Sequence, residues 1–197
     1  VLNNILIKAE GKKLHFSATN LEIAISYFVD ADVRAEGSIT IPAKLITSYV
    51  SFLSDEKVEL SIGDGMTLLI QSSTSTTKIK GISADEFPLI PKVDAEHSFS
   101  IGTSDLDAAV SETVFAASTN ISRPVLSGVY LSVDGNQLKM VSTDSYRLAE
   151  RKMTLDKKID GKFTCIIPAK TVAEIGRVTN RSEAKEVKID VSKNQVL

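Results

Sequence analysis

Few side chains in this sequence could carry covalent or metal chemistry. The histidines are His15 and His97, far apart in the chain and each in a predicted hairpin or linker, where a solvated side chain is expected. The single cysteine, Cys165, lies within a predicted strand and is expected as a small buried apolar residue rather than a nucleophile. Two acidic pairs are expected at solvated helix ends: Asp105 with Asp107, and Asp55 with Glu56.

Motifs that mark catalysis or nucleotide binding are missing from the sequence. It contains no glycine-rich dinucleotide loop, no Walker-type phosphate loop, no zinc-protease helix motif and no nucleophile elbow. An enzyme without a histidine, cysteine or carboxylate-pair centre would be unusual. The sequence therefore argues against catalysis and predicts no cofactor and no metal site.

Cationic side chains gather on one predicted helix, which begins at Pro168. Lys170 and Arg177 are seven residues apart, which places them on one side of a helix, and Arg181 extends that side. Such a face could contact nucleic-acid phosphates, an interaction that is independent of base sequence and sensitive to salt. An ordinary solvated helix face explains the same pattern. Because the net charge is −2, any contact with nucleic acid must come from a local basic face.

A second candidate site is the segment from Thr143 to Leu148, which follows a predicted strand and mixes small, aromatic and cationic residues. It is either a loop in which Asp144 accepts hydrogen bonds from nearby N–H groups, or a rim that binds a peptide. The second interpretation rests on Tyr146 and Arg147, because tyrosine and arginine are favoured anchors at interfaces. A catalytic role for Asp144 with Arg147 is a third interpretation.

A long internal repeat sets the domain organisation. Residues 1–26 align without a gap on residues 125–150, and most matched positions keep their polarity. The identical matches are Val1 with Val125, Leu2 with Leu126, Gly11 with Gly135, Leu14 with Leu138, and Thr19 with Thr143. The tetrapeptide Ile-Pro-Ala-Lys then occurs at 41–44 and again at 167–170. Such a repeat indicates two domains of one architecture.

Both copies predict the same order of elements, with hairpins and short strands followed by a helix that a proline begins. In the first copy the expected elements are strands over 5–9, 14–17, 23–33 and 38–41, a helix from Pro42, a hairpin over 58–71 and a strand over 76–82. In the second they are a strand over 98–101, a helix over 104–118, a hairpin over 129–142, a strand over 163–167, a helix from Pro168 and a hairpin from Val187. The fold class is therefore α+β.

Apolar stripes at helical spacing predict which faces of these helices are buried. The residues expected to face the cores are Leu45, Ile46, Tyr49, Val50 and Leu53 in the first copy, and Leu106, Ala109, Val110, Thr113, Val114, Ala117, Val172, Ile175 and Val178 in the second. Ser104 with Asp107 is expected to form a loosened capping box at the start of one helix.

Length and composition fit two ordinary globular domains, with 197 residues, 43% of them apolar and 24% charged. The segment from Phe87 to His97 contains two prolines and a charge cluster, so it predicts a linker, and the expected domains are 1–92 and 93–197. No apolar run reaches the length of a membrane span. The second copy begins earlier, and the first continues further, so we expect both domains to be completed by residues outside this sequence.

Several blocks resemble the bacterial sliding clamp family, the β subunit of DNA polymerase III. The segment 123–149, followed by Ile-Pro-Ala-Lys at 167–170, resembles the middle domain of that family. Residues 18–22, 41–44 and 84–88 (ATNLE, IPAK and ADEFP) resemble its first domain. The resemblance implies three similar domains per chain, and two chains that close head to tail into a homodimeric ring around duplex DNA.

In this DNA-clamp fold, helices face the hole and antiparallel sheets lie outside. The resemblance implies a cytoplasmic, non-enzymatic processivity factor that tethers the polymerase to double-stranded DNA. It implies a DNA contact at Arg123 and a helix from Pro168 that lines the hole, and we extend the DNA role to Lys170, Arg177, Lys44 and Lys78. Without the resemblance, the alternative is a two-domain module that binds protein partners only.

The resemblance also implies a groove that binds short linear motifs of polymerase, clamp loader and repair proteins. The residues that match its wall are Leu126, Thr143, Ser145, Tyr146, Arg147 and Leu148. Ser145-Tyr146 stands where the family commonly has Gly-His, so the aromatic wall is expected to accept a somewhat different motif.

Overall fold

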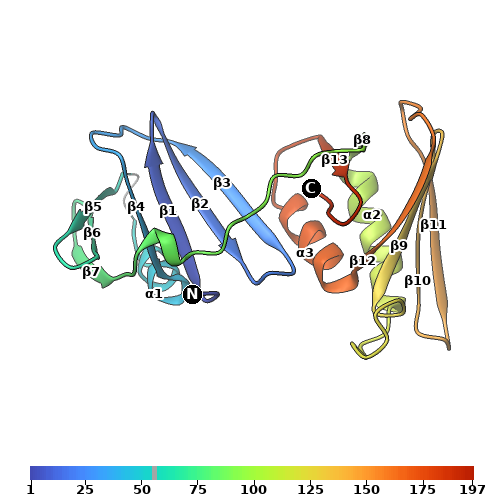
Figure 1. The fold of residues 1–197 in the computed structure, drawn as a ribbon, viewed down its shortest axis with the longest axis horizontal. Helices are drawn as coiled ribbons and strands as arrows, with labels where there is room; N and C mark the ends of the chain where they lie inside the picture. The colour runs from blue at the N-terminus through green and yellow to red at the C-terminus, as the bar shows by residue number, and fades with distance from the viewer. Residues whose placement is uncertain (55–56) are drawn as a thin grey trace. The chain divides into compact units, whose positions relative to one another are not determined.

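The computed structural model describes residues 1–54 and 57–197 and divides into two compact units, Val1–Pro91 and Lys92–Leu197 (Figure 1). Asp55 and Glu56, expected at a solvated helix end, lie outside the described residues. The division falls within the predicted linker, but both ends of that segment belong to folded structure. Phe87 is buried in the first unit, and His97 already begins a strand of the second.

The described residues of the first unit, 1–54 and 57–91, form two antiparallel sheets, one α-helix and one 3₁₀ turn. Its four-stranded sheet has the order β3-β2-β1-β4 and its three-stranded sheet the order β5-β6-β7. The elements are β1 (Asn4–Glu10), β2 (Lys13–Thr19), β3 (Ala24–Asp30), β4 (Gly37–Pro42), α1 (Ala43–Val50), β5 (Glu59–Gly63), β6 (Thr67–Gln71), β7 (Thr76–Lys80) and the 3₁₀ turn η1 (Ala84–Glu86). Alternating apolar residues of both sheets and one residue of α1 form the core: Ile7, Ile39, Ile41, Ile46, Leu68, Ile70 and Ile79.

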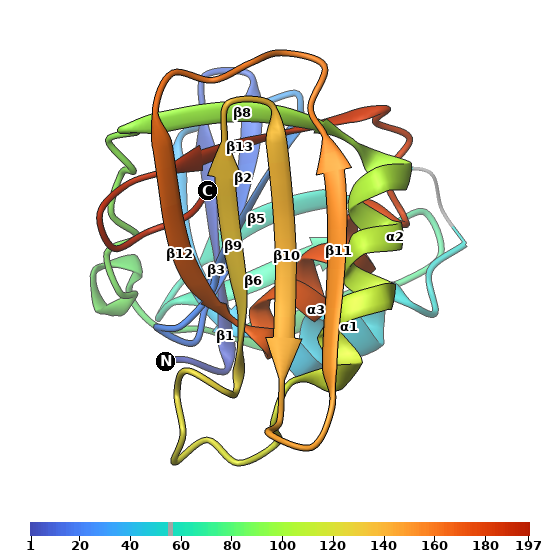
Figure 2. The same cartoon turned by 90° about the vertical axis from the view of Figure 1, so that its right-hand side faces the viewer.

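The second unit, 92–197, contains a four-stranded antiparallel sheet of order β11-β10-β9-β12 and a β13-β8 pair. Its elements are β8 (His97–Gly102), α2 (Thr103–Thr113), η2 (Val114–Ala116), β9 (Gly128–Asp134), β10 (Gln137–Thr143), β11 (Leu148–Thr154), β12 (Lys162–Pro168), α3 (Ala169–Thr179) and β13 (Glu186–Val191). Figure 2 shows the four strands side by side with α2 next to β11, and α2 packs against β10 and β11.

The internal repeat is confirmed by this topology. The strand order β3-β2-β1-β4 in the first unit is the order β11-β10-β9-β12 in the second, strand for strand. The glycine of each hairpin turn, Gly11 and Gly135, has φ near 61°, the left-handed conformation that glycine adopts without steric cost. The predicted α+β class with antiparallel sheets is also confirmed.

Details at the helix starts differ from the prediction. Pro42 and Pro168 are the last strand residues and cap α1 and α3 with extended ψ values of 119° and 132°, so each helix begins one residue later than expected. The capping box in the second unit was wrong: Gly102 caps α2 without a side-chain hydrogen bond. Asp107 instead accepts a hydrogen bond from Thr179 Oγ1, 2.7 Å away on α3.

The helix faces also differ in part from the apolar stripes. Leu45 and Val50 of α1 and Val178 of α3 are exposed, although all three were expected to face a core. The buried residues of α3 are Val172, which was expected, and Gly176 and Thr179, which were not. Hydrophobicity patterns could not find Gly176 and Thr179, because close approach of α2 and α3 requires small residues rather than large apolar ones.

Candidate functional site

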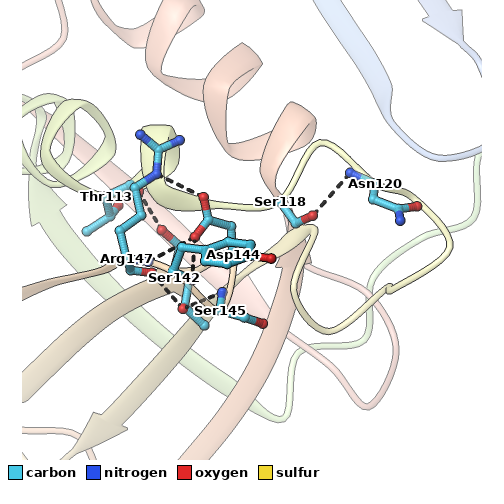
Figure 3. A network of polar contacts seen from close by, with 9 residues as sticks. Thr113, Ser118, Asn120, Ser142, Asp144, Ser145 and Arg147 are labelled. Atoms are coloured by element: carbon cyan, nitrogen blue, oxygen red, sulfur yellow. Dashed lines mark hydrogen bonds and ion pairs between the residues drawn. The ribbon is translucent and has the colours of Figure 1, made fainter.

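The loop between β10 and β11 is held together by its own polar groups (Figure 3). Thr143 Oγ1 donates to the Arg147 carbonyl at 2.7 Å and accepts from the Ser145 N–H at 3.1 Å. Asp144 Oδ1 accepts from the N–H groups of Tyr146 at 2.9 Å and of Arg147 at 3.0 Å. Ser145 takes the left-handed conformation, with φ near 80°. The expectation that Asp144 organises this loop is confirmed.

The equivalent loop of the first unit repeats this network bond for bond. Thr19 Oγ1 donates to the Ile23 carbonyl at 3.0 Å and accepts from the Leu21 N–H at 3.0 Å. Asn20 Oδ1 accepts from the N–H groups of Glu22 at 3.0 Å and of Ile23 at 2.8 Å. Leu21 is left-handed, with φ near 73°. The loop backbone is therefore a property of the repeat, and only the side chains that it presents differ between the units.

Arg147 is compensated within the loop. Its Nε donates to Asp144 Oδ2 at 3.0 Å, and its guanidinium lies over the Phe115 ring at 5.6 Å from the centroid. The backbone N–H groups of Tyr146 and Arg147, and after them the Arg147 side chain, hold the pKa of Asp144 below its ordinary value. The carboxylate thus stays ionised and faces the guanidinium. The contact between Phe115 and Arg147 was not predicted from the sequence. An aromatic residue near the end of a predicted helix was the one feature that could have indicated it.

Exposed apolar side chains surround this loop. Tyr146 is 97% exposed, and Leu148, Val125 and Phe115 are also exposed. Leu126 is half-buried, and its carbonyl accepts from Ser118 N–H at 2.8 Å. Because β9 and β10 are antiparallel, the residues that precede β9 and those that follow β10 lie at the same end of the sheet. The structure therefore places Leu126 and the loop 143–148 at one end of the second unit.

The predicted cations of the second unit lie on α3 and on the turn that precedes β9. Lys170 is exposed in the first turn of α3. The exposed Arg123 begins a turn in which its carbonyl accepts from the N–H groups of Leu126 and Ser127, both at 3.0 Å. Ser127 in turn accepts from Ala169 N–H at 3.0 Å, so this turn meets the start of α3. The structure thus brings Arg123 and Lys170 to one end of the unit.

Arg177 lies further along α3 and is paired with Glu174. Its Nε lies 3.0 Å from both carboxylate oxygens, and Nη2 also contacts Oε1. This pairing lowers the pKa of Glu174 and raises that of Arg177. Glu174 was not predicted from the sequence, although its position three residues before Arg177 on a helix is the spacing of such ion pairs.

The cations of the first unit lie on different surfaces. Lys44 is exposed on α1, whose Ile46 packs into the core. Lys78 is exposed on β7, and its neighbour Ile79 packs into the same core. Because neighbouring residues of a strand point to opposite faces, Lys78 faces away from the core and from α1. The structure does not bring Lys44 and Lys78 together.

The histidines and the cysteine lie against apolar or aromatic neighbours. His97 stacks on Phe163 with ring centroids 4.8 Å apart, and His15 packs edge-on against Phe28 at 4.5 Å, so both are half-buried rather than fully solvated as expected. Burial raises the pKa of the Cys165 thiol, as expected for an inert cysteine. Within residues 1–54 and 57–197, no three acidic, histidine or cysteine side chains are grouped to hold a metal ion. No helix of the described chain could cross a membrane.

Comparison with known proteins gives matches over both units. Residues 1–91 match the family model of the DNA polymerase III beta subunit, N-terminal domain, and residues 100–197 match that of its central domain. Beta sliding clamps of Halalkalibacterium halodurans and Bacillus subtilis are each 30% identical over 100% of this chain. The chain spans 54% of either relative.

Solved structures of sliding clamps are similar to almost the whole chain. The DNA polymerase sliding clamp of Bacillus subtilis superposes with a TM-score of 0.92 at 29% identity, over 99% of this chain and 53% of that one. The DNA polymerase III subunit beta of Pseudomonas aeruginosa gives a TM-score of 0.92 at 26% identity, over 99% of this chain and 54% of that one.

Proposed function

Since the chain belongs to the DNA polymerase III beta subunit family and matches its N-terminal and central domains, we propose that it forms part of a DNA sliding clamp. In this proposal a longer polypeptide pairs head to tail with a second copy and encircles duplex DNA in the cytoplasm. It tethers the replicative polymerase for processive synthesis and has no catalytic centre of its own.

The observation that carries the proposal is the shared topology of two units that match consecutive clamp domains. A repeated unit is what a closed ring of similar segments requires. Helices with exposed cations supply contacts to phosphates, which carry no base information and so hold a duplex without stopping at any sequence.

We infer that the DNA contacts of the second unit are made by Arg123, Lys170 and Arg177. Arg123 and Lys170 lie at one end of the unit, whereas Arg177 must leave Glu174 or share its charge with it. Lys44 on α1 is the corresponding cation of the first unit, at the repeated Ile-Pro-Ala-Lys position. Lys78 faces away from α1, so we leave it out of this surface.

We infer further that the loop 143–148 with Leu126 forms one wall of a groove for short linear motifs of polymerase, clamp loader and repair proteins. Its support is the exposed apolar rim on a backbone that its own hydrogen bonds hold rigid. The residues proposed for this wall are Leu126, Thr143, Ser145, Tyr146, Arg147 and Leu148.

Topological retention on DNA tests the clamp. A polypeptide that carries this chain, together with the remaining length of its relatives, is loaded onto a nicked circular plasmid and followed by gel filtration. We expect it to stay on the circle and to be lost when the plasmid is linearised. Equal retention on both forms would contradict encirclement, and failure to associate with either would favour a module that binds only proteins.

A further inference from the structure

We propose that Glu174 weakens the hold of α3 on DNA by competing with phosphates for Arg177, so that this contact breaks and forms again easily as the protein slides. The inference rests on the proposed DNA-contact surface of the second unit and assigns a role to an acidic residue within it. Glu174 is a positioning residue in this account, because it acts on DNA through Arg177.

Glu174 lies in the middle of a basic stripe along α3. The stripe consists of Lys170, Glu174, Arg177 and, just beyond the last turn, Arg181, at spacings of four, three and four residues. These spacings keep the four side chains on one side of the helix, opposite its buried residues. A carboxylate at this position repels the phosphates that its neighbours attract. Its presence therefore needs an explanation if the stripe contacts DNA.

The Glu174 carboxylate occupies an edge of Arg177 that could grip a phosphate. Arg177 Nε lies 3.0 Å from both carboxylate oxygens, and Nη2 also contacts Oε1. Two neighbouring guanidinium nitrogens of this kind form the fork that holds a phosphate through two parallel hydrogen bonds. While the ion pair is closed, a phosphate cannot take both of these bonds. Glu174 thus removes the strongest form of phosphate contact that Arg177 could make at this edge.

The ion pair is exposed enough to open. The Arg177 and Glu174 side chains are 51% and 38% exposed, and an ion pair in contact with water is weak. A DNA phosphate can therefore displace the carboxylate, and the carboxylate can take Arg177 back when the phosphate moves on. Because Arg177 has a partner in either state, the exchange leaves no charge unpaired. Such a contact adds attraction to the duplex without fixing the protein at one phosphate.

The experiment measures binding of a labelled short duplex to the chain by fluorescence anisotropy, from low to moderate salt. Glu174→Gln removes the charge and keeps the size and helix propensity of the side chain. We expect this change to tighten binding at low salt by about two- to fivefold, the range of an exposed ion pair. The slope of log affinity against log salt should steepen by up to about 0.9, because Arg177 then makes a full phosphate contact.

Glu150→Gln is the matched control. The Glu150 side chain is also 38% exposed and pairs with Lys152 at 2.9 Å, and its substitution changes the net charge by the same amount. Its neighbour Arg151 reaches Glu112 on α2, so Glu150 points to the opposite face of the sheet. We expect Glu150→Gln to leave the salt slope unchanged. Equal effects of the two glutamate substitutions would reduce the result to net charge and overturn the inference.

A double substitution tests whether Glu174 acts through Arg177. In an Arg177→Gln background the carboxylate has lost its partner, so Glu174→Gln should tighten binding less than it does in the wild type. An undiminished gain would show that Glu174 repels phosphates directly, and the role assigned to it would be wrong.

Lys170→Gln separates this inference from the proposed function. If Lys170→Gln weakens binding and Glu174→Gln does not tighten it, α3 contacts DNA and only the inference fails. If neither substitution changes binding, α3 does not contact DNA, and the proposed surface fails together with the inference. The encirclement of DNA is tested separately by the plasmid experiment.

Discussion

At the scale of single residues, Gly176 shows how a missing side chain determines packing. A Cβ on Gly176 would lie 2.8 Å from Val110 Cγ1, closer than real Cβ contacts allow. Beside it, Thr179 Oγ1 donates to Asp107 at 2.7 Å. The close approach of α2 and α3 thus depends on a small residue and one polar bridge rather than on apolar bulk.

Gly176→Ala should therefore destabilise the second unit. The better helix propensity of alanine contributes about 1 kcal/mol in its favour, but overpacking against a stiff valine costs about 1–3 kcal/mol. We expect a net loss of about 1 kcal/mol in the free energy of unfolding, measured by urea titration with circular dichroism. Combining the change with Val110→Ala should cost less than the sum of the two single changes. Strict additivity would show that the contact is not the cause.

Asp190 should make the stability of the second unit depend on pH. It accepts from Ser98 Oγ, a contact that joins β8 to β13, and its carboxylate lies 2.9 Å from Lys188 Nζ on the same strand. Both contacts lower its pKa from the ordinary 3.8. Because the folded pKa is the lower one, the stabilisation is complete above the unfolded value and is lost as pH falls through the folded one.

We expect the free energy of unfolding of the second unit to fall as the pH drops below about 4, and to fall less steeply in Asp190→Asn. Urea titrations at neutral pH and at two acidic values measure both slopes. Asp156→Asn should keep the wild-type slope, because the Asp156 side chain is exposed and makes no hydrogen bond or ion pair with the described residues. The same slope in Asp190→Asn would mean that this carboxylate does not link pH to stability.

At the scale of elements, the two loops 19–23 and 143–147 make the repeat a physical unit. Each uses a threonine hydroxyl that bridges the loop and a left-handed third residue. Thr19→Val and Thr143→Val keep the shape of the side chain and remove the bridge. We expect the amides of Leu21 and Ser145, which bond to these hydroxyls, to exchange with solvent up to about tenfold faster, because a typical hydrogen bond contributes about 1 kcal/mol. If only one loop responds, the shared network is not what holds both.

Some of these elements could be predicted from the sequence and others could not. The hairpins, the helices after Pro42 and Pro168 and the loop organised by Asp144 follow from turn residues and alternation, which are local signals. β11 was not expected, because its sequence LAERKMT carries three charged residues and Met153 is its one buried residue. Phe115 near Arg147 and Asp107 near Thr179 could not be foreseen, since their contacts join segments distant in sequence.

At the scale of the whole molecule, charge is distributed rather than concentrated. The net charge of −2 excludes a uniformly basic protein, so any contact with DNA must come from particular surfaces. The structure separates the candidates: Lys170 and Arg123 share one end of the second unit, and Lys44 and Lys78 lie on different surfaces of the first. The surface that faces DNA can therefore be identified by comparing substitutions of lysines that lie on these different surfaces.

Substitution of single lysines should distinguish the surface that contacts DNA. Binding of a short duplex is followed by fluorescence anisotropy from low to moderate salt, for Lys44→Gln, Lys170→Gln and Lys78→Gln. Each lysine that contacts a phosphate contributes about 0.9 to the slope of log affinity against log salt, because it releases a condensed counterion. We expect Lys44→Gln and Lys170→Gln to weaken binding and flatten the slope by about that amount. Lys78→Gln removes the same charge from a face turned away from α1 and should retain most of the wild-type slope. An equal effect of all three changes would show that DNA binding depends only on net charge, and the proposed contact surface on the helices would have to be abandoned.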